Sequence, residues 1–317
     1  MKKYFTQVTN KIKEYDSIYI MTHKNMDLDG FGAALGFVDI LKKYHKNGKI
    51  IFNPNTKEMS IQKAIELIKN KTYHLLDVSD VHEIDQNSLL VILDVHKKEM
   101  LEMPELLDQA KEIILVDHHI QKDPIISNLD LSEVSVSSTV EIIVNYLMEE
   151  NLTIDSLTST IMLAGIYIDT NSFNIKTTDQ TFEAAAYLMK NKADNVLKQS
   201  LFQEDKNEII HRKELLKNSH KINQNMMICT LDKKIYKTSD LAKIAEEILQ
   251  FENVEASFTI GYLDENVVGI SARSLGKIDI EKIMKKMGGG GHKTDAACKI
   301  ENSSITKVKE TLEKILR

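Results

Sequence analysis

Four short apolar segments of this chain each run directly into side chains that can bind a metal ion. Imidazole and carboxylate groups are unfavourable in an apolar core, but they are good ligands for divalent cations. In open α/β sheets the carboxyl ends of the strands form the edge at which ligands bind. We therefore predict a metal site where these segments end. The segments and their following side chains are residues 17–22 with His23, Asp27 and Asp29; residues 89–93 with Asp94 and His96; residues 113–116 with Asp117, His118 and His119; and residues 161–168 with Asp169.

Six of these side chains form the predicted ligand set, which is His23, Asp27, Asp29, Asp94, His118 and Asp169. Two histidines and four carboxylates exceed what one divalent ion with open water positions can use. We therefore predict two cations roughly 3.5 to 4 Å apart that share a carboxylate and a water, which becomes the hydroxide that attacks phosphorus. Oxygen ligands with some imidazole favour Mn²⁺ or Mg²⁺ over a closed zinc site.

Each of these residues also has a simpler interpretation. A lone aspartate at a strand end is more often a helix cap or a turn former than a ligand. Four such carboxylates at one edge would repel one another unless cations neutralised them, which favours the metal site. Asp117 and His96 are left open between orienting a ligand histidine and closing a turn. His119 is expected to face the substrate or to form a hydrogen bond rather than to bind metal directly.

Two further segments suggest contacts to a phosphate or a nucleotide. Ser137 and Ser138 precede a predicted helix, where an N-cap and a phosphate contact are about equally good interpretations. Arg273 and Ser274 end a predicted strand, and the guanidinium group suits a phosphate or a base edge, although an exposed arginine is the default.

A run of four glycines is the second specific signal of the chain. Consecutive glycines are tolerated where the backbone must approach another group closely or adopt positive φ, although a flexible turn is the simpler alternative. Amides of such a loop can bind a phosphate, and the histidine that follows can donate a hydrogen bond to it. The predicted substrate-binding residues of this loop are Gly289, Gly290, Gly291 and His292.

The length of 317 residues suggests two domains. Residues 1–190 alternate β-branched runs with helical patterns, which is typical of α/β folds with a mainly parallel sheet covered by helices. Residues 191–224 are charge-rich and predict a helical connector, and residues 225–317 predict a smaller α/β domain that binds substrate. The expected helices cover residues 30–41, 61–68, 138–149, 240–249 and 280–287.

Composition limits the class of partner and the compartment. The formal net charge of -6 disfavours a protein that binds long nucleic acid by bulk attraction. The two cysteines, Cys229 and Cys298, imply no disulfide framework and fit a reducing compartment. No apolar run approaches the roughly 18 residues of a membrane span. We expect a soluble, cytoplasmic chain without a membrane segment of its own.

Taken together, these motifs resemble the DHH phosphoesterase superfamily, in the branch that carries a DHH-associated C-terminal domain. The His23-x3-Asp27-x-Asp29 loop, Asp94, the Asp-His-His run at 117–119, Asp169 and the glycine-histidine loop occur in family order. Residues 165–170, 181–185 and 271–276 are most similar to the catalytic portion of cyclic-di-AMP phosphodiesterases. Whether the chain stands alone or is part of a larger membrane protein is left open.

The resemblance implies a role for each residue. His23, Asp27 and Asp94 would hold one Mn²⁺, and Asp29, Asp94, His118 and Asp169 the other, with Mg²⁺ or Co²⁺ as alternatives. His119 would lie near the scissile phosphate, so that Asp94, His118 and His119 form the catalytic group, while Arg273, His292 and the glycine amides would hold the distal nucleotide. This sequence departs from the family pattern at Met26 and at the glycines of residues 30–32, which we expect to loosen the loop that presents Asp27 and Asp29.

The implied activity is Mn²⁺-dependent hydrolysis of cyclic-di-AMP to pApA, with further cleavage to AMP and the choice of adenine over guanine left open. The alternative is a nano-RNase or 3′-phosphoadenosine-5′-phosphate phosphatase that acts on short oligonucleotides or pAp. A nucleotide sensor without catalysis is less favoured, because the ligand set is complete. The expected partners are a cyclic dinucleotide or a short oligonucleotide, and a homodimer is left open.

Overall fold

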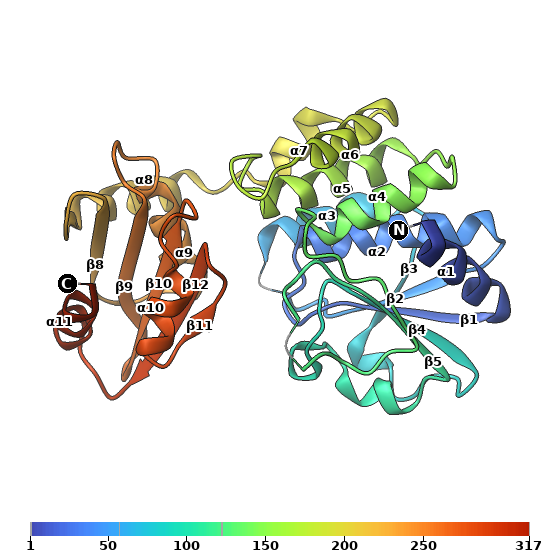
Figure 1. The fold of residues 1–317 in the computed structure, drawn as a ribbon, viewed down its shortest axis with the longest axis horizontal. Helices are drawn as coiled ribbons and strands as arrows, with labels where there is room; N and C mark the ends of the chain where they lie inside the picture. Colours follow the sequence, from blue (N-terminus) through green and yellow to red (C-terminus); the bar gives the residue numbers. More distant parts are fainter. Residues whose placement is uncertain (1, 57, 122, 317) are drawn as a thin grey trace. The chain divides into compact units, whose positions relative to one another are not determined.

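The computed structural model describes residues 2–56, 58–121 and 123–316. The chain divides into two compact units, Met1–Gln203 and Glu204–Arg317 (Figure 1). The metal-site residues predicted from the sequence all belong to the first unit. Arg273 and the glycine loop of residues 288–292 belong to the second unit.

A six-stranded parallel sheet forms the centre of the first unit, with the strand order β3-β2-β1-β4-β5-β6. The chain adds β2 and β3 on one side of β1 and then returns to place β4, β5 and β6 on the other side. This reversal creates a topological switch point between β1 and β4, and such points are where open α/β sheets bind ligands. The strands are β1 Ser17–Met21, β2 Gly48–Phe52, β3 His74–Asp77, β4 Ser88–Leu93, β5 Glu112–Val116 and β6 Leu129–Asp130.

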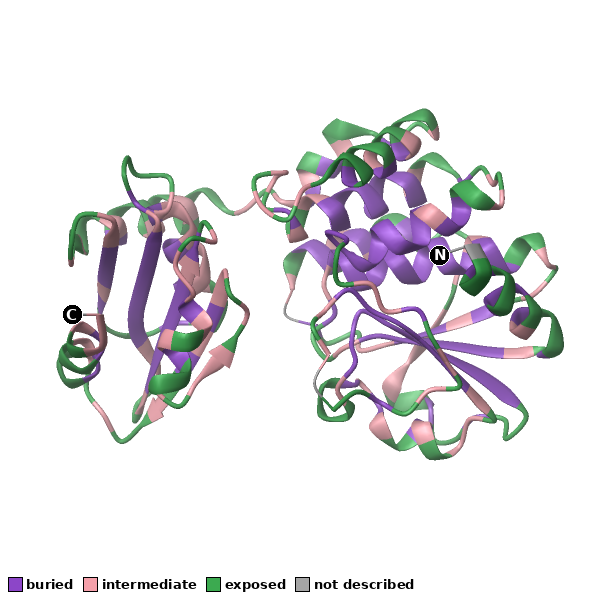
Figure 2. Ribbon diagram, viewed as in Figure 1, coloured by how far each residue is buried: buried purple, intermediate pink, exposed green. Residues whose placement is uncertain are grey.

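The helices of this unit pack on one face of the sheet and bury the larger of its two apolar clusters (Figure 2). The residues that cover the opposite face come from loops and from short 3-10 helices. The α-helices are α1 Lys2–Glu14, α2 Leu28–Lys43, α3 Met59–Ile68, α4 Thr139–Glu149, α5 Ser156–Asp169, α6 Asp179–Lys190 and α7 Asn195–Leu201. The 3-10 helices are η1 Val78–Asp80, η2 Lys98–Met100 and η3 Pro104–Asp108.

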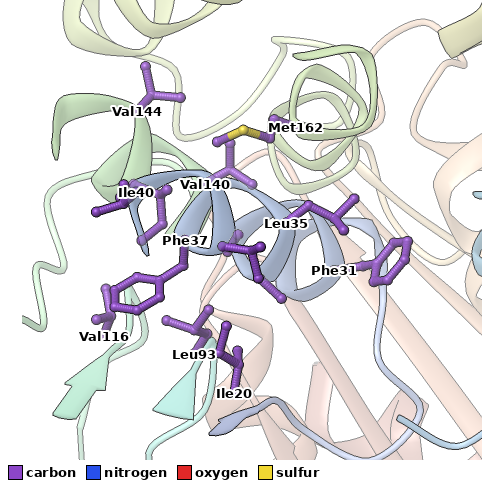
Figure 3. Close-up of a cluster of buried hydrophobic side chains, with 14 of the residues drawn as sticks. Ile20, Phe31, Leu35, Phe37, Ile40, Leu93, Val116, Val140, Val144 and Met162 are labelled. Carbon is purple, nitrogen blue, oxygen red and sulfur yellow. The ribbon is translucent and has the colours of Figure 1, made fainter. Parts of the chain in front are cut away.

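Helix α2 is the centre of the helical layer. Its buried side chains contact the strands on one side and helices α4 and α5 on the other, as the close-up in Figure 3 shows. Phe31 and Phe37 are almost fully buried, and burial of such a side chain contributes about 1.5–3 kcal/mol. This packing holds the N-terminal end of α2, and therefore the loop that precedes it, against the sheet.

One of the four apolar segments was wrongly predicted. Residues 161–168 do not form a strand that ends at Asp169; they belong to helix α5, which begins after the N-cap Asp155 and ends at Asp169. The side chain of Asp155 accepts hydrogen bonds from the amides of Leu157 and Thr158, at 2.9 and 3.2 Å. A helix that is buried on nearly all sides shows an apolar run without helical periodicity, so the pattern does not distinguish it from a buried strand.

The second unit contains a mixed sheet with the order β11-β12-β10-β9-β8-β7, in which only β8 and β9 are parallel neighbours. Helix α9 packs on one face, and α10 and α11 contribute to the core on the other. The strands are β7 Ser219–Lys221, β8 Met226–Ile235, β9 Ala256–Asp264, β10 Val267–Ser274, β11 Gly290–Gly291 and β12 Asp295–Glu301. The helices are α8 Lys206–Leu215, η4 Leu216–Asn218, α9 Thr238–Ile248, α10 Ile280–Lys286 and α11 Ile305–Leu316.

The predicted fold class is confirmed, with a parallel sheet and helices in the first unit and a second α/β unit after it. Within the part of the chain that the structure describes, no helix combines the length and the apolar character needed to cross a bilayer.

Candidate metal centre

The carboxyl ends of β1, β4 and β5 bring the predicted ligands together at the switch point. Asp94 follows β4 and adopts a left-handed backbone conformation with φ of 64°, while its amide donates to the carbonyl of Val116 at 2.9 Å. Aspartate tolerates this conformation better than most residues, and such backbone strain concentrates at functional sites. Among the described residues three groups could hold a metal ion, and Asp94 belongs to two of them, one with His23 and Asp27 and one with His118 and His119.

The first group consists of His23, Asp27 and Asp94, whose ligand atoms lie within 4.8 Å of one another. His23 Nε2 is 3.8 Å from Asp27 Oδ1 and 3.6 Å from Asp94 Oδ2. The other ring nitrogen, Nδ1, lies 2.8 Å from the carbonyl of Lys24 and must donate to it, because a carbonyl can only accept. Nε2 is therefore the ring nitrogen that faces the carboxylates, and in the neutral ring it would carry the lone pair that a metal ligand requires.

The second group consists of Asp29, His118 and Asp169, and Asp94 borders it. His118 Nε2 lies 3.1 Å from Asp169 Oδ2, 3.5 Å from Asp94 Oδ1 and 3.9 Å from Asp29 Oδ2. Among the described residues this buried nitrogen has no hydrogen-bond partner. Buried polar atoms are rarely left unpaired, so an unpaired imidazole nitrogen among three carboxylates fits a metal ligand.

The charges of the centre are also unbalanced without a cation. Burial, reinforced by the negative charge of Asp169, raises the pKa of Asp29 to about 7. Burial and the nearby Asp29 and Asp27 raise the pKa of Asp94 well above its usual range. Burial alone would lower the pKa of His23, but Asp27 outweighs it and raises that pKa to about 9. Divalent cations would neutralise this group of carboxylates and reverse these shifts.

The N-termini of helices α2 and α4 fix the orientation of the Asp27 and Asp29 carboxylates. Asp27 is the N-cap of α2 and accepts from the amides of Asp29 and Gly30, at 2.9 and 3.1 Å. Asp29 accepts from the first two amides of α4, those of Thr139 and Val140, at 2.7 and 2.9 Å. Unpaired amides and the helix dipole stabilise an ionised carboxylate at this position.

Thr139 was not predicted from the sequence, although it contacts two of the proposed ligands. Besides its amide bond to Asp29, its hydroxyl donates to Asp94 Oδ1 at 3.0 Å. The only signal in the sequence is that Thr139 follows the predicted cap Ser138. Which carboxylates such a threonine reaches depends on tertiary packing.

Ser137 and Ser138 lie next to this centre but are fully buried. Ser138 is the N-cap of α4 and accepts from the amide of Glu141 at 3.2 Å. The hydroxyl of Ser137 donates to the Glu141 carboxylate at 2.5 Å, and Thr181 of α6 donates to the same oxygen at 2.9 Å. The structure thus gives both serines a part in holding the start of α4, and their contact with a substrate stays a prediction.

Asp117, whose role was left open together with that of His96, connects His96 to His119. Its oxygens accept from Nδ1 of His96 and Nδ1 of His119, each at 2.7 Å. Burial opposes ionisation, but these two hydrogen bonds outweigh it and hold the pKa of Asp117 below its usual range. His119 is the most exposed of the three, with 27% of its side chain accessible, and its Nδ1 is 3.8 Å from Asp94 Oδ1. Asp117 therefore orients His119 beside the proposed metal ligands.

Close packing between α2 and α5 positions Asp169. A Cβ on Gly165 of α5 would lie 2.7 Å from the carbonyl oxygen of Leu28 and 2.9 Å from Cα of Asp29. Gly32 of α2 faces Met162 of α5 in the same way, at 3.0 Å from its Cα. The glycines of residues 30–32 lie inside helix α2, and Gly32 supports close helix packing. The expectation that they loosen the ligand loop finds no support in this arrangement.

We expect Gly165→Ala to lower the stability of the first unit by about 1–3 kcal/mol, because the new methyl group meets backbone rather than a mobile side chain. Gly30→Ala is the matched control, since its Cβ would meet Asp94 and Thr22 at ordinary contact distances of 3.4 and 3.5 Å. Thermal unfolding of both variants checks this. Equal melting temperatures for Gly165→Ala and the wild type would contradict the packing argument.

The predicted substrate-binding residues of the second unit come from β10 and from β11 with its flanking residues, and β12 lies between these two strands. Arg273 pairs with Asp295 in the sheet register and donates through Nε to Glu246 at 2.9 Å. Ser274 is buried, and its hydroxyl donates to the carbonyl of Ile278 at 2.7 Å. The amide of His292 donates to the carbonyl of Asp295 at 2.6 Å.

The four glycines differ in what a side chain would meet. Gly288 and Gly291 have positive φ values of 81° and 142°. A Cβ on Gly289 would lie 2.2 Å from the carbonyl oxygen of Ala297, whereas a Cβ on Gly290 would meet no atom within 4 Å. The loop is thus tightly packed at Gly289 and open at Gly290.

We expect Gly290→Ala to fold normally and to weaken nucleotide binding several-fold, because its methyl group would stand where a ligand approaches the backbone. Gly289→Ala should instead destabilise the second unit, since the clash involves the backbone of β12. Paired melting curves and AMP titrations check both. Unchanged binding in Gly290→Ala would argue against a ligand at this loop.

Comparisons with known proteins agree with this arrangement. Residues 17–166 match the DHH family N-terminal domain, and residues 223–317 match the DHHA1 domain. The chain is 33% identical to the cyclic-di-AMP phosphodiesterase GdpP of Bacillus subtilis over 95% of its own length and 48% of that protein. It is 31% identical to the cyclic-di-AMP phosphodiesterase PdeA of Listeria monocytogenes over 95% of its length and 47% of that protein. The chain thus spans about half the length of these relatives.

A third relative matches over nearly its whole length. The bifunctional oligoribonuclease and PAP phosphatase NrnA of Mycoplasma genitalium is 27% identical over 94% of this chain and 92% of that protein. Among solved structures, an exopolyphosphatase-related protein from Bacteroides fragilis superposes with a TM-score of 0.83 at 19% identity, over 99% of this chain and 96% of that one. The two matched domains, in this order, identify the chain as a member of the DHH family that carries a DHHA1 domain.

Proposed function

We propose that the chain is a divalent-metal-dependent phosphodiesterase that hydrolyses cyclic-di-AMP to pApA. The observation that carries this proposal is the similarity to two cyclic-di-AMP phosphodiesterases over 95% of this chain, with both units included. Hydrolysis adds water across one P–O bond of the cyclic dinucleotide and leaves a linear product with a terminal phosphate. Further cleavage of pApA to AMP is part of what the experiment below determines.

In this proposal Asp94 serves both metal positions. His23 and Asp27 complete the first position, and Asp29, His118 and Asp169 complete the second. Two bound Mn²⁺ ions, with Mg²⁺ or Co²⁺ as substitutes, would supply a water of lowered pKa as nucleophile and neutralise the charge of the phosphate. Thr139 and the α4 amides keep Asp94 and Asp29 in the orientation that binding requires.

The remaining residues would act on the substrate. His119 donates through Nδ1 to Asp117 and keeps 27% of its side chain accessible. We propose that this side chain faces the scissile phosphate. Arg273, Ser274, Gly289, Gly290, Gly291 and His292 would contribute nucleotide-binding groups from the second unit, with cationic, hydroxyl and amide donors suited to phosphate.

A product profile tests the proposed substrate. The Mn²⁺-loaded chain is incubated with cyclic-di-AMP, pApA, a short RNA and pAp in parallel, and the products are separated by anion exchange. We expect the cyclic dinucleotide to be consumed with pApA as the first product. Turnover of the short RNA and pAp alone would reject this substrate.

The second candidate is an oligoribonuclease and pAp phosphatase. The similarity to NrnA over 94% of this chain and 92% of that protein supports it. The same profile separates the candidates, since this alternative predicts mononucleotide products from short RNA and AMP from pAp. Retention of the cyclic dinucleotide after prolonged incubation would favour it.

A further inference from the structure

A pocket of about 200 Å³ lies in the first unit beside the ligand loop. Its walls come from the end of β1, the ligand loop itself, the end of β2 with its following loop, and the segment after η2. The residues used below are Thr22, Met26, Phe52, Asn53, Asn55 and Glu102. None of them belongs to the predicted ligand set or to the second unit.

The pocket shares its wall with the metal centre. Thr22 directly precedes the proposed ligand His23, and Met26 directly precedes the proposed ligand Asp27. Gly30 lies close to both: a Cβ placed on it would be 3.5 Å from Thr22 Cβ, in the pocket wall, and 3.4 Å from Asp94 Oδ2, in the metal centre. A group attached to a phosphate at the metal positions is therefore within reach of this pocket.

Backbone contacts hold this wall in place. His23 forms a β-bridge with Leu101, the amide of Lys24 donates to the carbonyl of Met100 at 2.7 Å, and the amide of Glu102 approaches the carbonyl of Thr22 at 3.4 Å. The segment that carries Glu102 is thus fastened to the ligand loop. The pocket is a preformed feature of the first unit.

The lining is mainly polar, and Met26, Ile51 and Phe52 are its apolar side chains. Met26 is buried and Phe52 is half-buried, so both offer apolar surface to a flat ring. Asn53 donates to Glu102 Oε1 at 3.1 Å and accepts from the amide of Asn55 at 3.0 Å. These bonds fix an amide beside a carboxylate, and precisely placed polar groups of this kind give a small-molecule pocket its specificity.

We propose that this pocket binds the nucleobase of the nucleoside that carries the scissile phosphate, and that it selects a base with an exocyclic amino group. This inference rests on the proposed function, because the metal positions must bind the phosphate. Carboxylates accept from exocyclic amines, and asparagine pairs with the amine and ring nitrogen of adenine. Glu102 and Asn53 supply these groups, while Phe52 and Met26 cover the ring.

Binding of three small phosphates to the Mn²⁺-loaded chain tests the inference by calorimetry. AMP carries phosphate, ribose and an amino-bearing base, IMP lacks the amino group, and ribose 5-phosphate lacks the base. We expect AMP to bind at least about tenfold more tightly than ribose 5-phosphate, with IMP between them. Equal affinities for AMP and ribose 5-phosphate would overturn the inference.

Two variants assign the effect to this pocket. Asn53→Ala and Glu102→Gln should each weaken AMP about three- to tenfold and leave ribose 5-phosphate unchanged. Asn87→Ala is the matched control, because Asn87 is exposed and precedes β4 at the opposite edge of the sheet. Glu102→Gln keeps the size of the side chain, so it remains informative if melting curves show that Asn53→Ala is unfolded. Wild-type AMP affinity in the folded variants would place the base elsewhere.

Failure of the proposed function gives a different result. If cyclic-di-AMP is not hydrolysed while AMP binding still depends on Asn53 and Glu102, the base-binding role of the pocket is supported and the proposed substrate is rejected. If cyclic-di-AMP is hydrolysed but these variants bind AMP like the control, the base-binding role of the pocket is rejected and the proposed activity is supported.

Discussion

Asp94→Asn is expected to reduce turnover by about 10³-fold or more, because the variant removes the one carboxylate that borders both groups of ligands. Asp94 directs Oδ2 toward His23 and Oδ1 toward His118, at 3.6 and 3.5 Å. Asparagine tolerates the left-handed backbone of this position and can still accept from Thr139, so the fold should persist. The loss should therefore reflect metal binding rather than unfolding.

Two measurements separate these causes. Metal content by mass spectrometry should fall together with turnover, while the melting temperature without metal should not fall, since a repelling carboxylate has been removed. Asp77→Asn is the matched control: Asp77 ends β3 at the same edge of the sheet but only caps η1. Full activity in Asp94→Asn would reject the shared-ligand assignment, and lost activity in Asp77→Asn would show that any aspartate at this edge is sensitive.

Metal removal is expected to make the chain least stable at neutral and alkaline pH. The native pKa of Asp29 is raised to about 7, that of Asp94 is raised well above its usual range, and that of His23 is raised to about 9. Between the unfolded and native pKa values the native state binds more protons than the unfolded state, so stability falls as pH rises. For Asp29 that window runs from about pH 4 to about 7, and for His23 from about 6.5 to about 9.

Melting temperatures in a chelator, measured from pH 5 to 9, should therefore decrease by on the order of 5 °C or more. His118 opposes this trend below about pH 6.5, because burial lowers its native pKa. With Mn²⁺ present the trend should disappear, since cations stabilise the ionised carboxylates and the neutral imidazoles. A metal-free chain that becomes more stable toward pH 9 would contradict the proposed charge balance.

The positions of the strand-end ligands could be predicted because they follow from the topology alone. In a parallel sheet all carboxyl ends meet at one edge, so His23, Asp94 and His118 had to lie near one another once their segments were strands. Ser138 could likewise be predicted as a cap, because a serine before a helical pattern serves this purpose.

Other features depend on packing that local patterns do not encode. Helix α5 was mistaken for a strand because its apolar run is buried on nearly all sides, although Asp169 still arrives at the centre. The contact of Thr139 with Asp94 and the close approach of Gly165 to Asp29 arise from segments far apart in the chain. The pocket beside the ligand loop combines three such segments, and no motif marks it.

The order of the strands also has a consequence for biosynthesis. The two sides of the switch point are built from β1 and β4, and the last proposed ligand, Asp169, lies at the end of α5. A ribosome must therefore complete nearly the whole first unit before all six ligands exist, and contacts between distant segments form slowly. Binding of metal at the complete site therefore follows assembly of the sheet. A folded chain that has not yet bound metal would have a stability that depends on pH.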